Sequence, residues 1–236
     1  MEFLTSPHLE RIAGLSHGFG MRFAGPRAEA RAAARTAFEA FGEVFFLRQV
    51  HGGAVAMPPW TEPPDADASR TDDAGVLLGI ETADCLPILI VDPAQRRVAA
   101  VHAGWRGTVA RVAQAAVRSL VAAGSDPRQL VASLGPAIGP CCYEVGRDVE
   151  EAFGESGWRF FTPGPGEKKC VDVAAANRAQ LEELGIPEVN IDRVDFCTRC
   201  REDLFFSYRR EREASPTGDG ANAGRMISVV GFSRPA

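Results

Sequence analysis

Residues 76–92 read Val-Leu-Leu-Gly-Ile-Glu-Thr-Ala-Asp-Cys-Leu-Pro-Ile-Leu-Ile-Val-Asp, and the rest of the chain is organised around them. Val76–Ile80 and Leu86–Val91 are apolar runs of strand length, rich in the branched residues typical of strands that are covered on both faces. Between the two runs lie Asp84 and Cys85, a carboxylate beside a thiol. The stretch therefore predicts two buried strands, with a reactive pair where the second strand begins.

The segment that follows predicts a hairpin. Residues 92–95 (Asp-Pro-Ala-Gln) are a turn sequence, because proline presets φ and aspartate caps its own backbone. Val98–Val101 is a third predicted strand, and it leads directly into His102. Such a hairpin carries Cys85 and His102 to neighbouring strand ends, so we expect the thiol and the imidazole to meet in space.

The composition excludes several classes of protein. The chain has 236 residues, 45% apolar and 24% charged, which is typical of a globular protein, and we expect one domain over residues 1–236. A net charge of -5 argues against nucleic acids and acidic membranes as partners. The sequence shows neither an apolar run of the roughly 18–20 residues that span a membrane nor a signal peptide. We expect a cytoplasmic protein, a monomer or a small homo-oligomer.

Cysteine and histidine are sparse, which restricts the metal sites that the chain can form. Six cysteines are too few for a disulfide scaffold in a chain of this length, and a reducing compartment keeps them as thiols. His51 follows a predicted strand at Val44–Leu47 and precedes two glycines, which let a ligand approach closely. The histidines of the chain are His8, His17, His51 and His102.

The other predicted elements interleave without a regular βαβ order. The predicted helices are Ala28–Phe41, Thr108–Ala123, Arg147–Phe153 and Val171–Leu184, the last capped by Asp172. Ser16–Arg22 is predicted as a short strand or a turn. The further predicted strands are Leu130–Leu134, Arg193–Cys197 and Met226–Phe232, and the predicted loops are residues 58–73, 154–169 and 215–224. An α/β chain with mixed sheets fits this order better than a doubly wound parallel sheet.

The predicted helix at Thr108–Ala123 follows Gly104-Trp105-Arg106-Gly107. Backbone N–H groups and the dipole at its N-terminus favour an anion, and Arg106 supplies a bidentate donor for phosphate. Arg48 is a second candidate for binding phosphate. For both arginines a salt bridge to a nearby carboxylate remains an equal alternative.

Five motifs occur together in a specific order. They are Gln-Val-His-Gly at 49–52, Thr-Ala-Asp-Cys-Leu-Pro at 82–87, Val-His-Ala-Gly-Trp-Arg-Gly at 101–107, Gly-Pro-Ala-Ile-Gly-Pro-Cys-Cys-Tyr-Glu-Val at 135–145, and Phe-Phe-Ser-Tyr-Arg-Arg at 205–210. From about His17 to Phe232 the chain resembles the YfiH family, also called the multicopper polyphenol oxidoreductase (laccase) family or peptidoglycan editing factor. It departs from the family at residues 21–26, where members have a glycine pair.

The resemblance implies a fold, a cofactor and a set of reactions. The implied fold is α/β (α+β), a single-domain sandwich of mixed β-sheets flanked by helices, similar to the cysteine-hydrolase-like domain of a bacterial deamidating toxin. The implied cofactor is one zinc ion on His51, Cys85 and His102, with copper as the alternative. The implied reactions are phosphorolysis of adenosine, inosine, guanosine and methylthioadenosine, and deamination of adenosine. The implied partners are therefore a purine nucleoside and phosphate.

This ligand set has a chemical logic. Three protein ligands leave a fourth zinc position open, which is the pattern of catalytic sites. Zinc lowers the pKa of bound water to about 7, which makes hydroxide available to attack C6 of adenine. Without the resemblance, Cys85 would be interpreted as an inert buried thiol. We assign Asp84, Cys85, His102 and Arg106 to catalysis; for Asp84 the alternative is capping of the turn.

Further residues are assigned to substrate binding with weaker arguments. They are Arg48, Gly107, Cys142, Tyr208 and Arg209. For Cys142 a small apolar residue in a tight loop is an equal alternative. Cys197-Thr-Arg-Cys200 is a lone CxxC motif, and a structural zinc requires four ligands, so a metal or redox role is the minority interpretation.

Three other hypotheses compete with the zinc enzyme. A copper-dependent polyphenol oxidase predicts more histidine-rich sites than four histidines can supply. A metal-free hydrolase that edits a peptidoglycan precursor would use Cys85 as nucleophile and His102 as base. The last hypothesis is non-catalytic binding of a cell-wall precursor.

Overall fold

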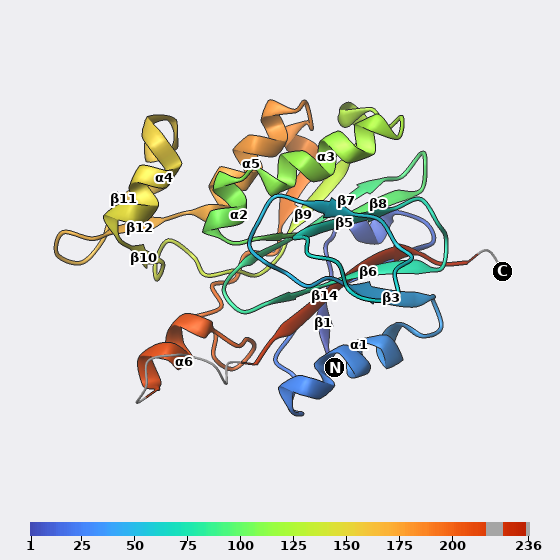
Figure 1. Ribbon diagram of the computed structural model, residues 1–236, viewed down its shortest axis with the longest axis horizontal. Helices are drawn as coiled ribbons and strands as arrows, with labels where there is room; N and C mark the ends of the chain where they lie inside the picture. Colours follow the sequence, from blue (N-terminus) through green and yellow to red (C-terminus); the bar gives the residue numbers. More distant parts are fainter. Residues whose placement is uncertain (216–223, 235–236) are drawn as a thin grey trace.

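The fold is a sandwich of two β-sheets with helices on both outer faces. Figure 1 shows the computed structural model, which describes residues 1–215 and 224–234. Helix α1 covers the outer face of one sheet, and helices α2, α3 and α5 cover the outer face of the other (Figure 1). The expected α/β fold of mixed sheets flanked by helices is therefore confirmed.

The larger sheet contains the predicted hairpin. β7 and β8 pair antiparallel with Leu86 opposite Ala103 and Pro87 opposite His102, so Cys85 and His102 do lie at neighbouring strand ends. The sheet has the strand order β13-β9-β7-β8-β5-β4. Its strands are β4 (Val55–Ala56), β5 (Ala68–Thr71), β7 (Leu86–Asp92), β8 (Arg97–Ala103), β9 (Val131–Leu134) and β13 (Ile191–Arg193).

The second sheet joins both ends of the chain. Its order is β1-β2-β14-β6-β3, with β3 and β6 parallel and the other pairs antiparallel. Its strands are β1 (Phe3–Leu4), β2 (Leu15–Gly20), β3 (Glu43–Phe46), β6 (Val76–Thr82) and β14 (Met226–Phe232). The predicted strands at 76–80 and 86–91 thus belong to different sheets.

Side-chain alternation explains why β7 is apolar throughout. Ile88 and Ile90 pack toward the helices, whereas Leu89 and Val91 pack against the second sheet. Each residue of the strand is buried on one face or the other. A continuous apolar run is what a strand between two covered faces requires.

The helices differ from the prediction at one instructive point. The single helix predicted over 108–123 is wrong, because Arg111 adopts a left-handed conformation (φ 58°) that separates α2 from α3. The predicted cap of α5 is confirmed, since the Asp172 carboxylate accepts the Ala175 backbone N–H at 2.9 Å. The helices are α1 (Ala30–Phe38), α2 (Trp105–Val109), α3 (Val112–Ala122), α4 (Arg147–Gly157), α5 (Val173–Glu183) and α6 (Tyr208–Ala214). Turns of 3-10 helix lie at Leu9–Arg11, Arg27–Glu29, Pro127–Gln129, Trp158–Phe160 and Glu188–Asn190.

Two predicted loops and one predicted strand need correction. The 58–73 stretch is not all surface loop, because β5 lies in it and is mostly buried. The 154–169 stretch begins inside α4, and it contains part of a small sheet of β10 (Glu144–Val145), β11 (Phe161–Pro163) and β12 (Lys169–Val171). The strand predicted over Arg193–Cys197 is wrong beyond its first residue, because β13 begins at Ile191 and ends at Arg193. Most of the predicted 215–224 loop lies outside the described residues. Among the residues described, no helix is both long and apolar enough to cross a membrane.

Candidate active site

Cys85 lies where the chain crosses from one sheet to the other. β6 ends at Thr82 in the five-stranded sheet, and β7 begins at Leu86 in the six-stranded sheet. Within the crossing, Asp84 has a φ of 82°, a left-handed value that aspartate and asparagine tolerate better than other side chains. Cys85 directly precedes β7, in which Leu89 faces the second sheet.

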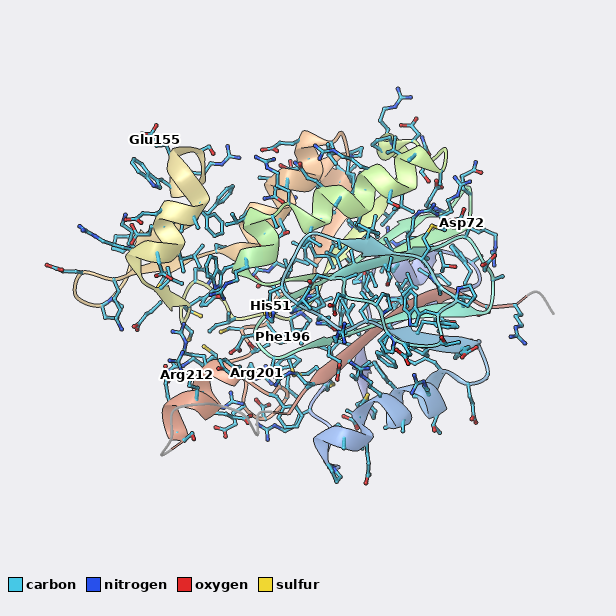
Figure 2. All side chains as sticks on the ribbon, viewed as in Figure 1. His51, Asp72, Glu155, Phe196, Arg201 and Arg212 are labelled. Atoms are coloured by element: carbon cyan, nitrogen blue, oxygen red, sulfur yellow. The ribbon has the colours of Figure 1, made fainter. Side chains whose placement is uncertain are left out.

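The three predicted metal ligands meet at this end of the sandwich. The donor atoms of His51, Cys85 and His102 all lie within 4.8 Å of one another. The Cys85 Sγ is 3.9 Å from the His51 Nε2, and the two imidazole rings meet edge to face with their centroids 4.8 Å apart. His102 is buried and His51, labelled in Figure 2, is exposed, so the group is accessible to solvent at His51.

A buried carboxylate connects the two histidines. Asp67 is fully buried, and its Oδ1 lies 2.7 Å from the His102 Nδ1. The same carboxylate accepts the backbone N–H groups of Val50, His51 and Gly52 at 3.2, 2.9 and 2.6 Å. With Nδ1 donating to the carboxylate, the Nε2 of His102 is the nitrogen on the side of Cys85, and it offers a lone pair to a metal ion once its proton is lost.

Electrostatics favour the ionised thiol. Burial alone would raise the pKa of Cys85, but the imidazoles of His102 and His51 lower that pKa below its ordinary value. Burial opposes a charge on His102, yet Cys85 and Asp67 raise the pKa of this imidazole. Burial would raise the pKa of Asp67, but hydrogen bonds from His102 and Gly52 lower it, and the net pKa of this carboxyl lies below its ordinary value. The site therefore favours thiolate, which is the form of cysteine that binds metals and attacks electrophiles.

The residues present fit a metal ion. Two imidazoles and one thiolate are a donor set for both zinc and copper. Gly104 provides the necessary space, because a Cβ at that position would lie 2.9 Å from the Cys85 Sγ and 3.3 Å from the His51 Cδ2. A side chain at position 104 would therefore displace the donors.

A cavity of about 570 Å³ opens over the three donors. Its volume is in the range that binds a small organic molecule. The cavity carries both arginines and carboxylate, so it is suited to a polar ligand. Its lining residues are Arg31, Arg48, Gln49, His51, Glu81, Ala83, Cys85, His102, Arg106, Tyr208 and Arg225.

The arginines of the cavity differ in their partners. Arg31 forms an ion pair with Glu81, and Arg48 forms one with Asp65 at an exposed position. The salt-bridge alternative therefore holds for Arg48. Arg106 instead stacks on the Trp105 ring, 4.3 Å from its centroid, and pairs with no carboxylate in the part of the chain that is described.

Three residues assigned to substrate binding lie outside the cavity lining. Gly107 is buried inside α2, where a Cβ would meet Val112 and backbone oxygens. Arg209 donates from Nη2 to the Glu144 carbonyl at 2.8 Å, and Cys142 lies 3.4 Å from the sulfur of Cys200. Tyr208 does line the cavity.

The structure places the Asp84 carboxylate in a structural role. It accepts hydrogen bonds from the Thr198 Oγ1 at 2.6 Å, the Ser207 Oγ at 3.0 Å and the Arg209 backbone N–H at 2.7 Å. These partners all belong to the C-terminal segment, and Asp84 is not part of the cavity lining. These contacts are neither a cap on the turn that contains Asp84 nor a contact with the cavity, so they support a third role, the anchoring of the C-terminal segment.

Two positioning residues were missed from the sequence. Asp67 lies among prolines and other aspartates in a stretch that predicts a loop, and its burial has no local signal. Gln49 holds the backbone of Glu81 through two hydrogen bonds of 2.8 Å, which ties the His51 loop to the end of β6. Only its place two residues before His51 could have pointed to it.

Comparison with known proteins shows the family of the chain. A model of the family described as multi-copper polyphenol oxidoreductase laccase matches residues 26–233. The chain belongs to this family. It is 36% identical over 192 residues to a protein named purine nucleoside phosphorylase YfiH from Escherichia coli, covering 78% of this chain and 72% of that one. The predicted kinship with YfiH is thereby confirmed.

Two further matches extend the comparison. The chain is 40% identical over 169 residues to adenosine deaminase RL5 from an unknown prokaryotic organism. That alignment covers 70% of this chain but 61% of the length of the deaminase. The crystal structure of YlmD from Geobacillus stearothermophilus superposes with a TM-score of 0.84 at 30% identity, covering 97% of this chain and 94% of that one.

Proposed function

We propose that the chain is a zinc-dependent purine nucleoside phosphorylase with adenosine deaminase activity, acting on adenosine, inosine, guanosine and methylthioadenosine. The observation that carries the proposal is the convergence of His51, Cys85 and His102 beneath a cavity that contains Arg106. The names of the relatives supply the reaction class, since they include purine nucleoside phosphorylase and adenosine deaminase.

The protein would hold the metal through the Cys85 thiolate and the two imidazoles. Bound zinc supplies Lewis-acid chemistry and activates water at neutral pH. Asp67 fixes the ring of His102 and, through three backbone N–H groups, the loop that carries His51. Such partners of the ligands orient them and raise their basicity.

The cavity residues would bind the two substrates. In phosphorolysis a phosphate oxygen bonds to C1′ of the ribose as the bond from C1′ to the purine nitrogen breaks, giving a free base and ribose 1-phosphate. Arg106 would bind the phosphate, because its guanidinium offers parallel N–H donors and stacks on the Trp105 ring. Tyr208, exposed at the cavity, offers an aromatic face for the purine. In deamination water adds at C6 and ammonia leaves.

One assay tests the proposal directly. Pure, zinc-replete protein is incubated with adenosine in the presence and absence of phosphate, and adenine, inosine and hypoxanthine are separated and quantified. We expect adenine only with phosphate and inosine in both conditions. Absence of turnover by protein that carries a full metal complement would refute the proposal.

The histidines also bear on copper. His8 contacts Asp192 at 3.8 Å, and the His17 Nε2 accepts the Ser6 backbone N–H at 3.0 Å, so neither joins His51 and His102. Two histidines and one cysteine supply ligands for one ion rather than for several coppers. Metal analysis of protein expressed without added metal distinguishes the two ions. If the protein contained copper and oxidised phenols efficiently, copper would have to replace zinc in the proposal.

A specific observation also favours a second candidate, a metal-free cysteine hydrolase acting on a peptidoglycan precursor. Cys85, His102 and Asp67 form a nucleophile, a base and an orienting carboxylate in the order of a catalytic triad. The two candidates separate on metal content. A stoichiometric zinc that is lost in both Cys85→Ala and His102→Ala supports the zinc enzyme. Full hydrolysis of the precursor by metal-free protein, abolished by alkylation of the thiol, supports the cysteine hydrolase.

A further inference from the structure

Four cysteines gather at a place separate from the His51, Cys85 and His102 group. Their sulfurs all lie within 4.8 Å of one another, although the residues come from two distant segments. One segment is the loop after β9, and the other precedes α6. The cluster consists of Cys141, Cys142, Cys197 and Cys200. We call it the four-cysteine cluster.

The spacing of the sulfurs suits a single tetrahedral ion. The Sγ of Cys200 lies 3.4 Å from that of Cys142 and 3.8 Å from that of Cys141. Four thiolates around one zinc, at a Zn–S distance of about 2.3 Å, place neighbouring sulfurs about 3.8 Å apart. All six cysteines of the chain are free thiols in the structure, so the cluster is not spent on disulfides. An iron–sulfur cluster would hold the four sulfurs further apart, because several irons would separate them.

Two of the four sulfurs, those of Cys197 and Cys142, have donors that stabilise negative charge. The Gly139 backbone N–H donates to the Cys197 Sγ at 3.3 Å, and the Cys200 backbone N–H donates to the same sulfur. The Arg199 guanidinium lies 3.7 Å from the Cys142 Sγ. Four thiolates on a divalent cation carry a net charge of -2, so N–H donors and a guanidinium are the partners that such a site requires.

The backbone leaves room for these sulfurs at one glycine. A Cβ on Gly139 would lie 3.3 Å from the Cys141 Sγ and 3.4 Å from the Cys197 Cβ. The loop is held to the C-terminal segment by a bridge between Ala137 and Cys197, and the Thr198 N–H donates to the Ala137 carbonyl at 3.0 Å. The two halves of the cluster are thus held in register by backbone contacts.

We propose that the four-cysteine cluster binds one structural zinc ion. Four protein ligands close the coordination sphere, which is the pattern of structural rather than catalytic zinc. Binding displaces the protons of those cysteines that are still thiols, and these protons pass to solvent. The site would cross-link the loop at 139–142 to the segment at 197–200. That segment continues through Thr198, which holds Asp84, to Tyr208 in the cavity wall.

The lone CxxC motif did not predict this site, because its second pair of ligands is not a CxxC. Cys141 and Cys142 are adjacent in the chain, and adjacency is not a familiar zinc spacing. Only the fold brings the adjacent pair close to Cys197 and Cys200.

The decisive measurement is the metal content of variants purified with a thiol reductant and zinc. We expect two zinc ions in the wild type and one in the His51→Ala/His102→Ala double variant. We expect one in Cys197→Ser/Cys200→Ser as well, and two in the control Cys170→Ser, which removes a cysteine outside both groups. Because the two groups are counted separately, failure of the catalytic proposal and failure of this one give different results.

A second measurement tests the proposal even if the Cys197→Ser/Cys200→Ser variant fails to fold, because it leaves the four-cysteine cluster intact. Cobalt is substituted into the His51→Ala/His102→Ala variant, where we expect the intense thiolate-to-metal absorption of a tetrahedral four-sulfur site. Removal of the ion by a chelator should lower the Tm of that variant. The proposal would be overturned if this variant contained no metal or contained iron in place of zinc. It would also be overturned if two cysteines of the cluster formed a disulfide in protein kept under a thiol reductant.

Discussion

The Nδ1 of His102 and the Oδ1 of Asp67 lie 2.7 Å apart in the buried end of the sandwich. The same carboxylate accepts three backbone N–H groups from the loop of His51, so one side chain sets the position of both imidazoles. A carboxylate in this place joins strand β8, which carries His102, to the connection from β3 to β4, which carries His51 and passes between the two sheets.

Asp67→Asn tests this link. The amide keeps the shape of the side chain but removes its charge and one acceptor, so we expect zinc affinity to fall by roughly 10- to 100-fold, with a parallel loss of activity. The measurement is a competition titration with a chromogenic chelator. Asp72→Asn is the control, since Asp72 lies on the same stretch but far from His51 (Figure 2). Unchanged affinity in Asp67→Asn would contradict the assigned role.

Gly104→Ala tests the space around the donors. The new Cβ would lie 2.9 Å from the Cys85 Sγ, so the sulfur must shift, and we expect kcat/KM to fall by roughly 10- to 100-fold. Gly52→Ala is the matched control, because its nearest contact would be an ordinary 3.7 Å to the Asp67 carboxylate. Equal activities of the two variants would show that the sulfur position is not restrictive.

Thr198→Val tests the support of the crossing turn. The substitution removes a hydroxyl that donates to the buried Asp84 carboxylate, and we expect the free energy of unfolding to fall by about 1–3 kcal/mol. Urea unfolding gives the value, and Thr162→Val, at an exposed strand position, serves as the control. If Thr198→Val matches the control, the hydrogen bond to Asp84 contributes nothing measurable.

Arg106→Gln tests the proposed phosphate site. Loss of a charged donor pair should raise the KM for phosphate in phosphorolysis by roughly 10- to 100-fold, while deamination, which uses no phosphate, keeps its KM for adenosine. Steady-state kinetics of both reactions provide the comparison. Arg147→Gln, at the exposed start of α4, is the control. A matched rise in both KM values would place Arg106 on the nucleoside instead.

His17 predicts a dependence of stability on pH. Burial lowers the pKa of His17 below 6.5, although Glu10 and Asp192 oppose the effect. As pH falls below about 6.5, the unfolded chain binds a proton on this residue before the folded protein does, so stability decreases until the folded pKa is passed. Between about pH 7 and pH 5, a range around that ordinary pKa, we expect the free energy of unfolding to fall less in His17→Gln than in the wild type. Parallel losses would exclude the effect.

Much of the fold could be predicted because local pattern and tertiary environment agree. The strand at Leu86–Val91, the turn after it and the cap at Asp172 follow from apolar runs, turn residues and capping chemistry. The break at Arg111 could not be predicted, since arginine has no special preference for a left-handed conformation and the flanking apolar pattern continues across it.

The site was predictable only in part, for a related reason. His51, Cys85 and His102 lie in distinctive motifs, and the hairpin register follows from the strands. Asp67 has no such signal, because its burial depends on the pairing of β5 with β8, and its partner His102 is 35 residues further along the chain. Asp84 was assigned to chemistry because a carboxylate next to a thiol suggests it, yet its partners come from more than a hundred residues later.

The crossing at residues 83–85 also determines when, during folding, the three donors can come together. His51 lies in the connection from β3 to β4 and Cys85 in the connection from β6 to β7, and both connections run from the five-stranded sheet to the six-stranded sheet, to which His102 belongs. A half-assembled chain with correct strands but undocked layers would therefore be unable to capture an ion. Uptake of metal by the refolding protein should accordingly be among its last events, a reporter of completed docking rather than of secondary structure.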